Sequence, residues 1–78
     1  MDEITKFLKK RTAKERQILL EAVRSITENK LADLDLTKIK GEKNVFRIRI
    51  GKFRINFKKE KNDNFITKID KRDEQTYR

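Results

Sequence analysis

Residues 45–58 decide the fold, and they read Val45-Phe-Arg-Ile-Arg-Ile-Gly-Lys-Phe-Arg-Ile-Asn-Phe-Lys58. From Phe46 onward, apolar and polar side chains alternate strictly on both sides of Gly51-Lys52, which is the period of a half-buried β-strand. The pattern predicts two antiparallel strands, at about 45–50 and 52–59, joined by a tight turn. One face of this hairpin would carry isoleucine and phenylalanine, and the other arginine and lysine.

The positive charge of the chain is concentrated around the same hairpin. The 78 residues include 22 Lys/Arg and 13 Asp/Glu, a formal net charge of +9. Residues 38–61 alone hold ten Lys/Arg against two acids, which leaves +8 in this segment. Because like charges side by side on a sheet repel one another, a polyanion such as nucleic acid is the expected partner.

The composition excludes several kinds of site. The chain has no cysteine and no histidine, which removes disulfides, zinc–thiolate sites and the usual acid/base group near neutral pH. We therefore expect no metal and no cofactor. The apolar runs are too short for a membrane span or a signal peptide, so we expect a cytoplasmic protein without membrane contact. A chain of this length makes one domain, residues 1–78, with a thin core.

Two helices are predicted before the hairpin. Ile4, Phe7 and Leu8 have helical spacing and indicate a short amphipathic helix at about residues 2–10. The motif Thr12-Ala-Lys-Glu15 fits a capping box and predicts a second helix, from about residue 13 to residue 29. Its expected apolar stripe is Ile18, Leu19, Ala22, Val23 and Ile26.

A third strand is predicted at about residues 64–70, after a polar loop at residues 61–64. It would complete a three-stranded antiparallel meander with both helices on one face, an α+β fold. Residues 30–40 are interpreted as a polar connection. By strand parity, Phe65, Thr67 and Ile69 would face the helices, and Ile66 would lie on the basic side. We accordingly interpret the phenylalanines of the strands as packing residues and not as stacking platforms, namely Phe46, Phe53, Phe57 and Phe65.

Four motifs taken in order resemble a known family. They are the turn Ile39-Lys-Gly41, the strands from Val45 to Arg54, the late Arg72 and the terminal Tyr77. Over roughly residues 4–78 this arrangement resembles the RelE/ParE superfamily of toxins from toxin–antitoxin systems. The resemblance implies a toxin held inactive by a cognate antitoxin, with operator DNA as a further partner of the toxin–antitoxin complex. Many members cleave messenger RNA in the ribosomal A site, whereas the ParE-like branch poisons DNA gyrase.

The chain departs from the family pattern at its start. Family chains usually begin with a β-strand before the first helix, and here Met1 leads almost directly into the predicted helix. We therefore expect a sheet without that strand, whose open edge invites strand addition from an antitoxin or from a second copy of the chain.

The resemblance also implies an active site for metal-independent RNA cleavage, by attack of a ribose 2′-oxygen on the adjacent phosphate. Arg49 and Arg54 would contact the phosphate, Arg72 would act at the leaving 5′-oxygen, and Tyr77 would stack on a base or transfer a proton. The residues implied as catalytic are Arg47, Arg49, Arg54, Arg72 and Tyr77. The further candidates for nucleic-acid binding are Lys43, Lys52, Lys58, Lys68 and Lys71. No general base is identified.

Three function classes remain open at this point. The first and favoured one is a ribosome-dependent messenger RNA endoribonuclease that inhibits translation. The second is a ParE-like or other toxin that acts by binding alone, and the third is a small nucleic-acid-binding module without toxicity. The expected basic face for binding phosphodiester chains requires the arginines to point to the same side of the sheet and not to be paired off internally with carboxylates.

Overall fold

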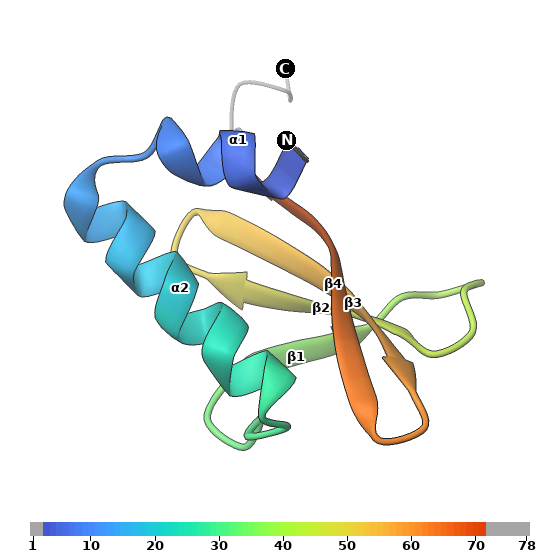
Figure 1. The fold of residues 1–78 in the computed structure, drawn as a ribbon. Helices are drawn as coiled ribbons and strands as arrows, with labels where there is room; N and C mark the ends of the chain where they lie inside the picture. Colours follow the sequence, from blue (N-terminus) through green and yellow to red (C-terminus); the bar gives the residue numbers. More distant parts are fainter. Residues whose placement is uncertain (1–2, 72–78) are drawn as a thin grey trace.

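The structure is a computed structural model that describes residues 3–71. Two helices, α1 (Glu3–Lys9) and α2 (Ala13–Thr27), precede the four strands β1 (Asp35–Lys38), β2 (Val45–Ile50), β3 (Phe53–Glu60) and β4 (Asp63–Lys71). The strands form one antiparallel sheet in the order β1-β2-β3-β4 (Figure 1). The fold is therefore α+β, as the periodicity predicts.

The sheet has one strand more than the sequence indicates. β1 lies within the segment interpreted as a polar connection, and it pairs with β2 from Asp35 opposite Arg49 to Lys38 opposite Phe46. All four of its residues are exposed, so the strand has no buried side chain and no hydrophobic period to reveal it. Pairing with the backbone of β2 makes it a strand. The expectation of three strands is wrong.

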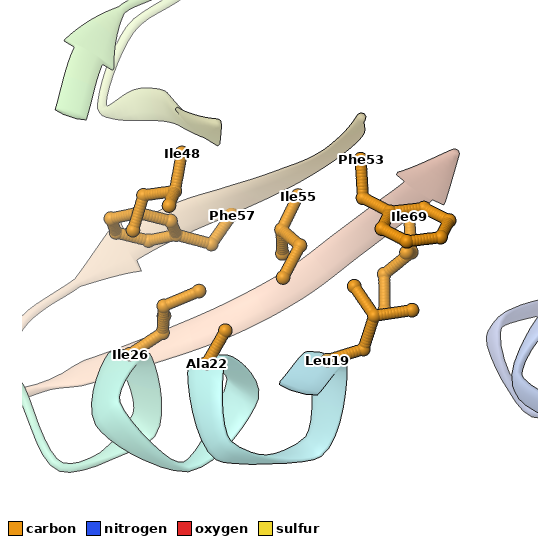
Figure 2. Close-up of a cluster of buried hydrophobic side chains, with 8 residues drawn as sticks. All are labelled: Leu19, Ala22, Ile26, Ile48, Phe53, Ile55, Phe57 and Ile69. Carbon is orange, nitrogen blue, oxygen red and sulfur yellow. The ribbon is translucent and has the colours of Figure 1, made fainter. Parts of the chain in front are cut away.

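The core lies between α2 and the sheet. Leu19, Ala22 and Ile26 project from α2 toward Ile48, Ile55 and Phe57, which are all buried (Figure 2). α1 adds Phe7, whose ring meets Phe53 edge to face with 6.1 Å between centroids. Ile18 is 41% exposed, so the buried stripe of α2 is narrower than the sequence pattern predicts.

Polar contacts fix the corner between the two helices. Thr12 and Glu15 form the predicted capping box at the start of α2, and Arg16 donates from Nε to the carbonyl of Leu8 at 3.1 Å, near the end of α1. Lys52, in the β2–β3 turn, lies 3.3 Å from a carboxylate oxygen of Glu15. The hydrogen bond from the backbone N–H of Thr12, assisted by Lys52, holds the pKa of Glu15 below its ordinary value of 4.5.

Asn64 joins the end of α2 to the sheet. Asn29, predicted to stop the helix, has a left-handed backbone with φ of 60°, just beyond the C-cap residue Glu28. Asn64 is 7% exposed, and its amide nitrogen donates to the carbonyl of Ile26 at 2.8 Å and to Oδ1 of Asn29 at 3.2 Å. The Ile26 carbonyl also accepts from the backbone N–H of Asn29 at 3.0 Å, so this buried side chain adds a second hydrogen bond at the end of the helix and ties that end to β4.

A β-bulge reverses the two faces of β4 along its length. Lys68 pairs with Asn56 and Ile66 pairs with Phe57, so Thr67 is the extra residue, and its hydroxyl donates to the carbonyl of Asn56 at 3.2 Å. Before the bulge, Ile66 packs against the core and Phe65 is 50% exposed. The predicted core placement of Phe65 and Thr67 is wrong, and so is the outward placement of Ile66, because simple alternation does not survive a bulge.

The β3–β4 connection is also shorter than expected. The predicted polar loop at residues 61–64 is a turn of two residues, Lys61 and Asn62, between strands that continue to Glu60 and from Asp63. Lys61 has a φ of 50°, the left-handed conformation that such tight turns use. β3 and β4 therefore stay paired up to the turn itself, with Glu60 opposite Asp63.

Replacing Asn64 should destabilise the fold. Asn64→Ala removes two hydrogen bonds, to the Ile26 carbonyl and to Oδ1 of Asn29, and leaves the carbonyl only its bond from the backbone N–H of Asn29. At about 0.5–1.5 kcal/mol for each bond, we expect a loss of about 1–3 kcal/mol in the free energy of unfolding. Urea denaturation followed by circular dichroism measures it. The matched variant Asn62→Ala, at an exposed turn position, should stay within about 0.5 kcal/mol of wild type. Equal midpoints for the two variants would contradict this role.

The depressed pKa of Glu15 should make the stability depend on pH. The contribution of an acid with a lowered pKa is present above its unfolded value, near 4.5, and is lost as the pH falls through the lower folded value. Wild type should therefore have a higher melting temperature than Glu15→Gln at neutral pH, and the gap should close on acidification below about pH 4.5. Glu21→Gln, which changes an exposed carboxylate of α2, is the control. A gap that stays constant down to about pH 3 would refute the assignment.

Candidate nucleic-acid interface on the sheet

The face of the sheet opposite the helices, called here the outer face, carries most of the predicted site. Cross-strand pairing arranges its side chains in rows that run from strand to strand. The first row is Asp35, Arg49, Arg54 and Asp70, the second is Thr37, Arg47, Asn56 and Lys68, and the third is Val45, Lys58 and Phe65. No helix of residues 3–71 covers this face (Figure 1).

The three arginines of the strands share this face, as the alternation predicts. Each is held to a neighbouring strand through its Nε: Arg54 to Asp70 at 3.2 Å, Arg49 to Asp35 at 3.4 Å, and Arg47 to Asn56 at 3.4 Å. The Nη groups take no part in these three bonds. Because paired guanidinium N–H groups match the oxygens of a phosphate, arginines positioned in this way can bind phosphate with little further ordering.

Carboxylates from β1 and β4 reduce the charge of the outer face. Of the two conditions set by the sequence, the shared face is met, but Arg49 and Arg54 are each paired with a carboxylate. Both pairs are open to solvent, with side chains 34% and 33% exposed for Arg54 and Asp70, and 51% and 57% exposed for Arg49 and Asp35. Exposed pairs of this kind are worth at most about 1 kcal/mol, so a phosphate can compete with them.

The lysine candidates are divided between several places. Lys58 and Lys68 lie on the outer face, 3.3 Å from Glu60 and 3.5 Å from Asp70, respectively. Lys43 lies in the exposed loop between β1 and β2. Lys52 contacts Glu15 on the helix side, and Lys71 pairs with the core residue Phe53, so these two do not join the arginine rows.

Two of the residues that the resemblance implies as catalytic, Arg72 and Tyr77, lie outside the described residues. The roles that the resemblance implies for Arg72 and Tyr77 therefore stay predictions. The nearest described neighbour in the chain is Lys71, the last residue of β4, which follows Asp70, the partner of Arg54.

Sequence reasoning missed three members of the outer face. Asp35 lies on the unpredicted strand, the sequence pattern gives Asn56 no role, and strand parity predicts Phe65 in the core. The alternation of β3 does put Asn56 on the polar face next to Arg54, so that signal was present in the sequence. No local signal reports Asp35, because only the pairing of β1 with β2 brings it to Arg49.

Electrostatic stabilisation is the chemistry that this face can perform. Among the described strand residues, this face holds five cations, Arg47, Arg49, Arg54, Lys58 and Lys68, and four carboxylates, Asp35, Glu60, Asp63 and Asp70, which leaves an excess of one positive charge. Such an arrangement binds a phosphodiester and stabilises negative charge that develops on it.

Comparison with known proteins gives one informative match. The chain is similar to a chain in the crystal structure of the RelB–RelE antitoxin–toxin complex from Methanococcus jannaschii, with a TM-score of 0.64 and 27% sequence identity. The alignment covers 94% of this chain and 87% of the other. No protein-family model and no curated protein matches the sequence. Within residues 3–71, neither helix is long and apolar enough to cross a membrane.

Neutralising Asp70 should strengthen the binding of polyanions. Asp70→Asn removes the carboxylate that faces both Arg54 and Lys68, so the variant should elute from a heparin column at a higher salt concentration than wild type. Its stability should change by no more than about 1 kcal/mol, since the pair is partly exposed. Glu21→Gln makes the same change of charge on α2 and is the control. Elution of Asp70→Asn no later than this control would argue against the outer face as the binding surface.

Proposed function

We propose that this chain is the toxin of a toxin–antitoxin pair and that it acts through the outer face of its sheet. The likeness to a chain of the RelB–RelE complex, over nearly the whole length of both chains, supports a role in a toxin–antitoxin system. The choice of toxin over antitoxin rests on one observation: the guanidiniums of Arg47, Arg49 and Arg54 lie together on a sheet face without a helical cover. Such a face suits a polyanionic target.

The proposed activity is ribosome-dependent cleavage of messenger RNA. In this reaction the 2′-oxygen of one ribose attacks the adjacent phosphorus, the bond to the 5′-oxygen of the next nucleotide breaks, and a 2′,3′-cyclic phosphate remains. Arg49 and Arg54, which pair across β2 and β3, would hold the phosphate and stabilise its growing negative charge. Removing one such group typically lowers the rate roughly 100- to 1,000-fold.

Proton transfer is assigned to the end of the chain. The 2′-hydroxyl must lose a proton and the 5′-oxygen must gain one, and arginine is a poor base because it stays charged. Lys58 and Lys68 are each ion-paired with a carboxylate, so neither is offered as the base. We assign the leaving oxygen to Arg72 and stacking or proton transfer to Tyr77. Alignment of the 2′-oxygen by the ribosome supplies a further part of the rate.

A toxin that acts by binding alone is the second candidate. Its support is that the two carboxylates of the first row, Asp35 and Asp70, are ion-paired with arginines and so are not free to act as a base. A face that binds phosphates without a free base fits a gyrase-directed toxin or a non-catalytic nucleic-acid module as well as a nuclease. The experiment below separates these functions.

The proposed partners follow from the same surfaces. A cognate antitoxin would inhibit the chain by covering the outer face or by adding a strand at β1 or β4, which are the edges of the sheet. The messenger RNA and the ribosome are the targets of the free toxin. Operator DNA is the proposed partner of the toxin–antitoxin complex.

Replacing Arg49 and Arg54, which lie opposite each other on β2 and β3, should abolish toxicity without unfolding the protein. We expect induced wild-type chain to arrest growth, and the purified chain to cut messenger RNA on translating ribosomes. Arg49→Gln with Arg54→Gln should lower the cutting rate at least roughly 100-fold, because both phosphate contacts are lost. Primer extension on the messenger RNA measures the cuts, and thermal denaturation checks the fold.

The matched control removes two charges elsewhere. Lys6→Gln with Lys14→Gln changes two exposed lysines of the helices by the same net charge and should cut at the wild-type rate. Growth arrest with intact messenger RNA and a DNA-damage response would support the gyrase-directed alternative instead. Absence of growth arrest would overturn the toxin assignment.

A further inference from the structure

Phe65 is an aromatic side chain on the basic face. The β-bulge at Thr67 reverses the parity of β4, so Phe65 pairs with Lys58 and lies on the outer face, in the third row. Its side chain is 50% exposed, the largest exposed fraction among the exposed large hydrophobic residues of the described chain. The other four phenylalanines contribute to the core or pack against it. The fold therefore gains nothing evident from a phenyl ring at this position.

A hollow of about 590 Å³ lies beside this ring. Its walls include Phe65, Lys43, Lys58 and Lys61, together with the carboxylates of Glu60 and Asp63. The lysines come from three separate elements, the β1–β2 loop, β3 and the β3–β4 turn. An exposed ring beside amino groups from several elements is the combination that single-stranded nucleic acids require, because bases stack on the ring while phosphates contact the cations.

The hollow lies on the same face of the sheet as the arginine rows. Arg54 and Lys58 lie on the same face of β3, four residues apart, which corresponds to about 13 Å at 3.3 Å per residue. One RNA strand lying along β3 can therefore meet the arginines at one end and Phe65 at the other. A duplex hides the faces of its bases and cannot use the ring in this way.

We propose that the hollow around Phe65 is a binding subsite for one unpaired base of single-stranded RNA, with the flanking phosphates on Lys58 and Lys43. The inference rests on the proposed function and deepens it, since it names a substrate contact outside the arginine rows. Phe65 acts by stacking and takes no part in the cleavage chemistry.

The first test uses tryptophan fluorescence. The chain has no tryptophan, so Phe65→Trp places a single indole at the subsite, with a larger stacking surface than phenyl. Addition of an unstructured oligoribonucleotide should quench its emission, and a duplex RNA of the same length should not. The control Leu20→Trp, at a position of α2 that is 48% exposed, should show no quenching with either RNA. Equal quenching of the two variants would overturn the proposal.

The second test separates stacking from charge. Phe65→Ala should weaken binding of the oligoribonucleotide roughly 5- to 150-fold and leave the salt dependence of binding unchanged. Lys58→Gln should instead lower the slope of log K against log salt by about 0.7, the value for one phosphate contact on a single strand. Leu20→Ala, which removes exposed apolar surface from α2, should bind like wild type.

The outcomes distinguish this subsite from the function on which it rests. Wild-type affinity in Phe65→Ala, with loss of binding in Arg49→Gln/Arg54→Gln, would overturn the subsite and leave the proposed function standing. If wild type itself binds no single-stranded RNA, both fail. If Phe65→Ala keeps its RNA affinity but no longer binds the antitoxin, the ring is a protein contact and the subsite is wrong.

Discussion

The register between β2 and β3 is the constraint on which the rest of the structure depends. Ile48 opposite Ile55 places two fully buried side chains on the helix side, and Arg49 opposite Arg54 follows one position later on the other side. A shift by one residue would bury the guanidiniums and expose the core. The packing of α2 against Ile48, Ile55 and Phe57 therefore also keeps the arginines together in the solvent, although their charges repel.

Neighbouring strands relieve that repulsion and orient the arginines. Asp35 on β1 and Asp70 on β4 flank the pair, so the first row runs from carboxylate through two guanidiniums to carboxylate. Arg49 and Arg54 contact these carboxylates through Nε, and the negative charges lower the positive potential of the outer face. In return, the side chains are ordered before a ligand arrives, which lowers the entropy lost on binding. The outer face therefore presents ordered hydrogen-bond donors for phosphate, and it is not a diffuse basic patch.

The sequence predicts what strict periodicity encodes and misses what tertiary pairing creates. Alternation in β2 and β3, the capping box at Thr12 and the stop at Asn29 lie where the pattern indicates, because each depends on local side chains. β1 has no buried residue, and it exists through its hydrogen bonds to β2. The bulge at Thr67 depends on the register with Asn56, so the exposure of Phe65 could not be read from its own neighbours. For the same reason, the sequence does not predict that Asp35 lies beside Arg49 and forms an ion pair with it.

NMR signals of the arginine Nε–Hε groups, followed during titration with a single-stranded oligoribonucleotide, test most directly whether the outer face binds phosphodiester chains. The groups of Arg47, Arg49 and Arg54 should give separate signals in the free protein, since each bonds to a different partner, and all three should shift together as RNA is added. The signal of Arg24, on α2 and paired with Glu28, should stay in place. Shifts confined to Arg24, or none at the three strand arginines, would contradict the claim that the outer face binds phosphodiester chains.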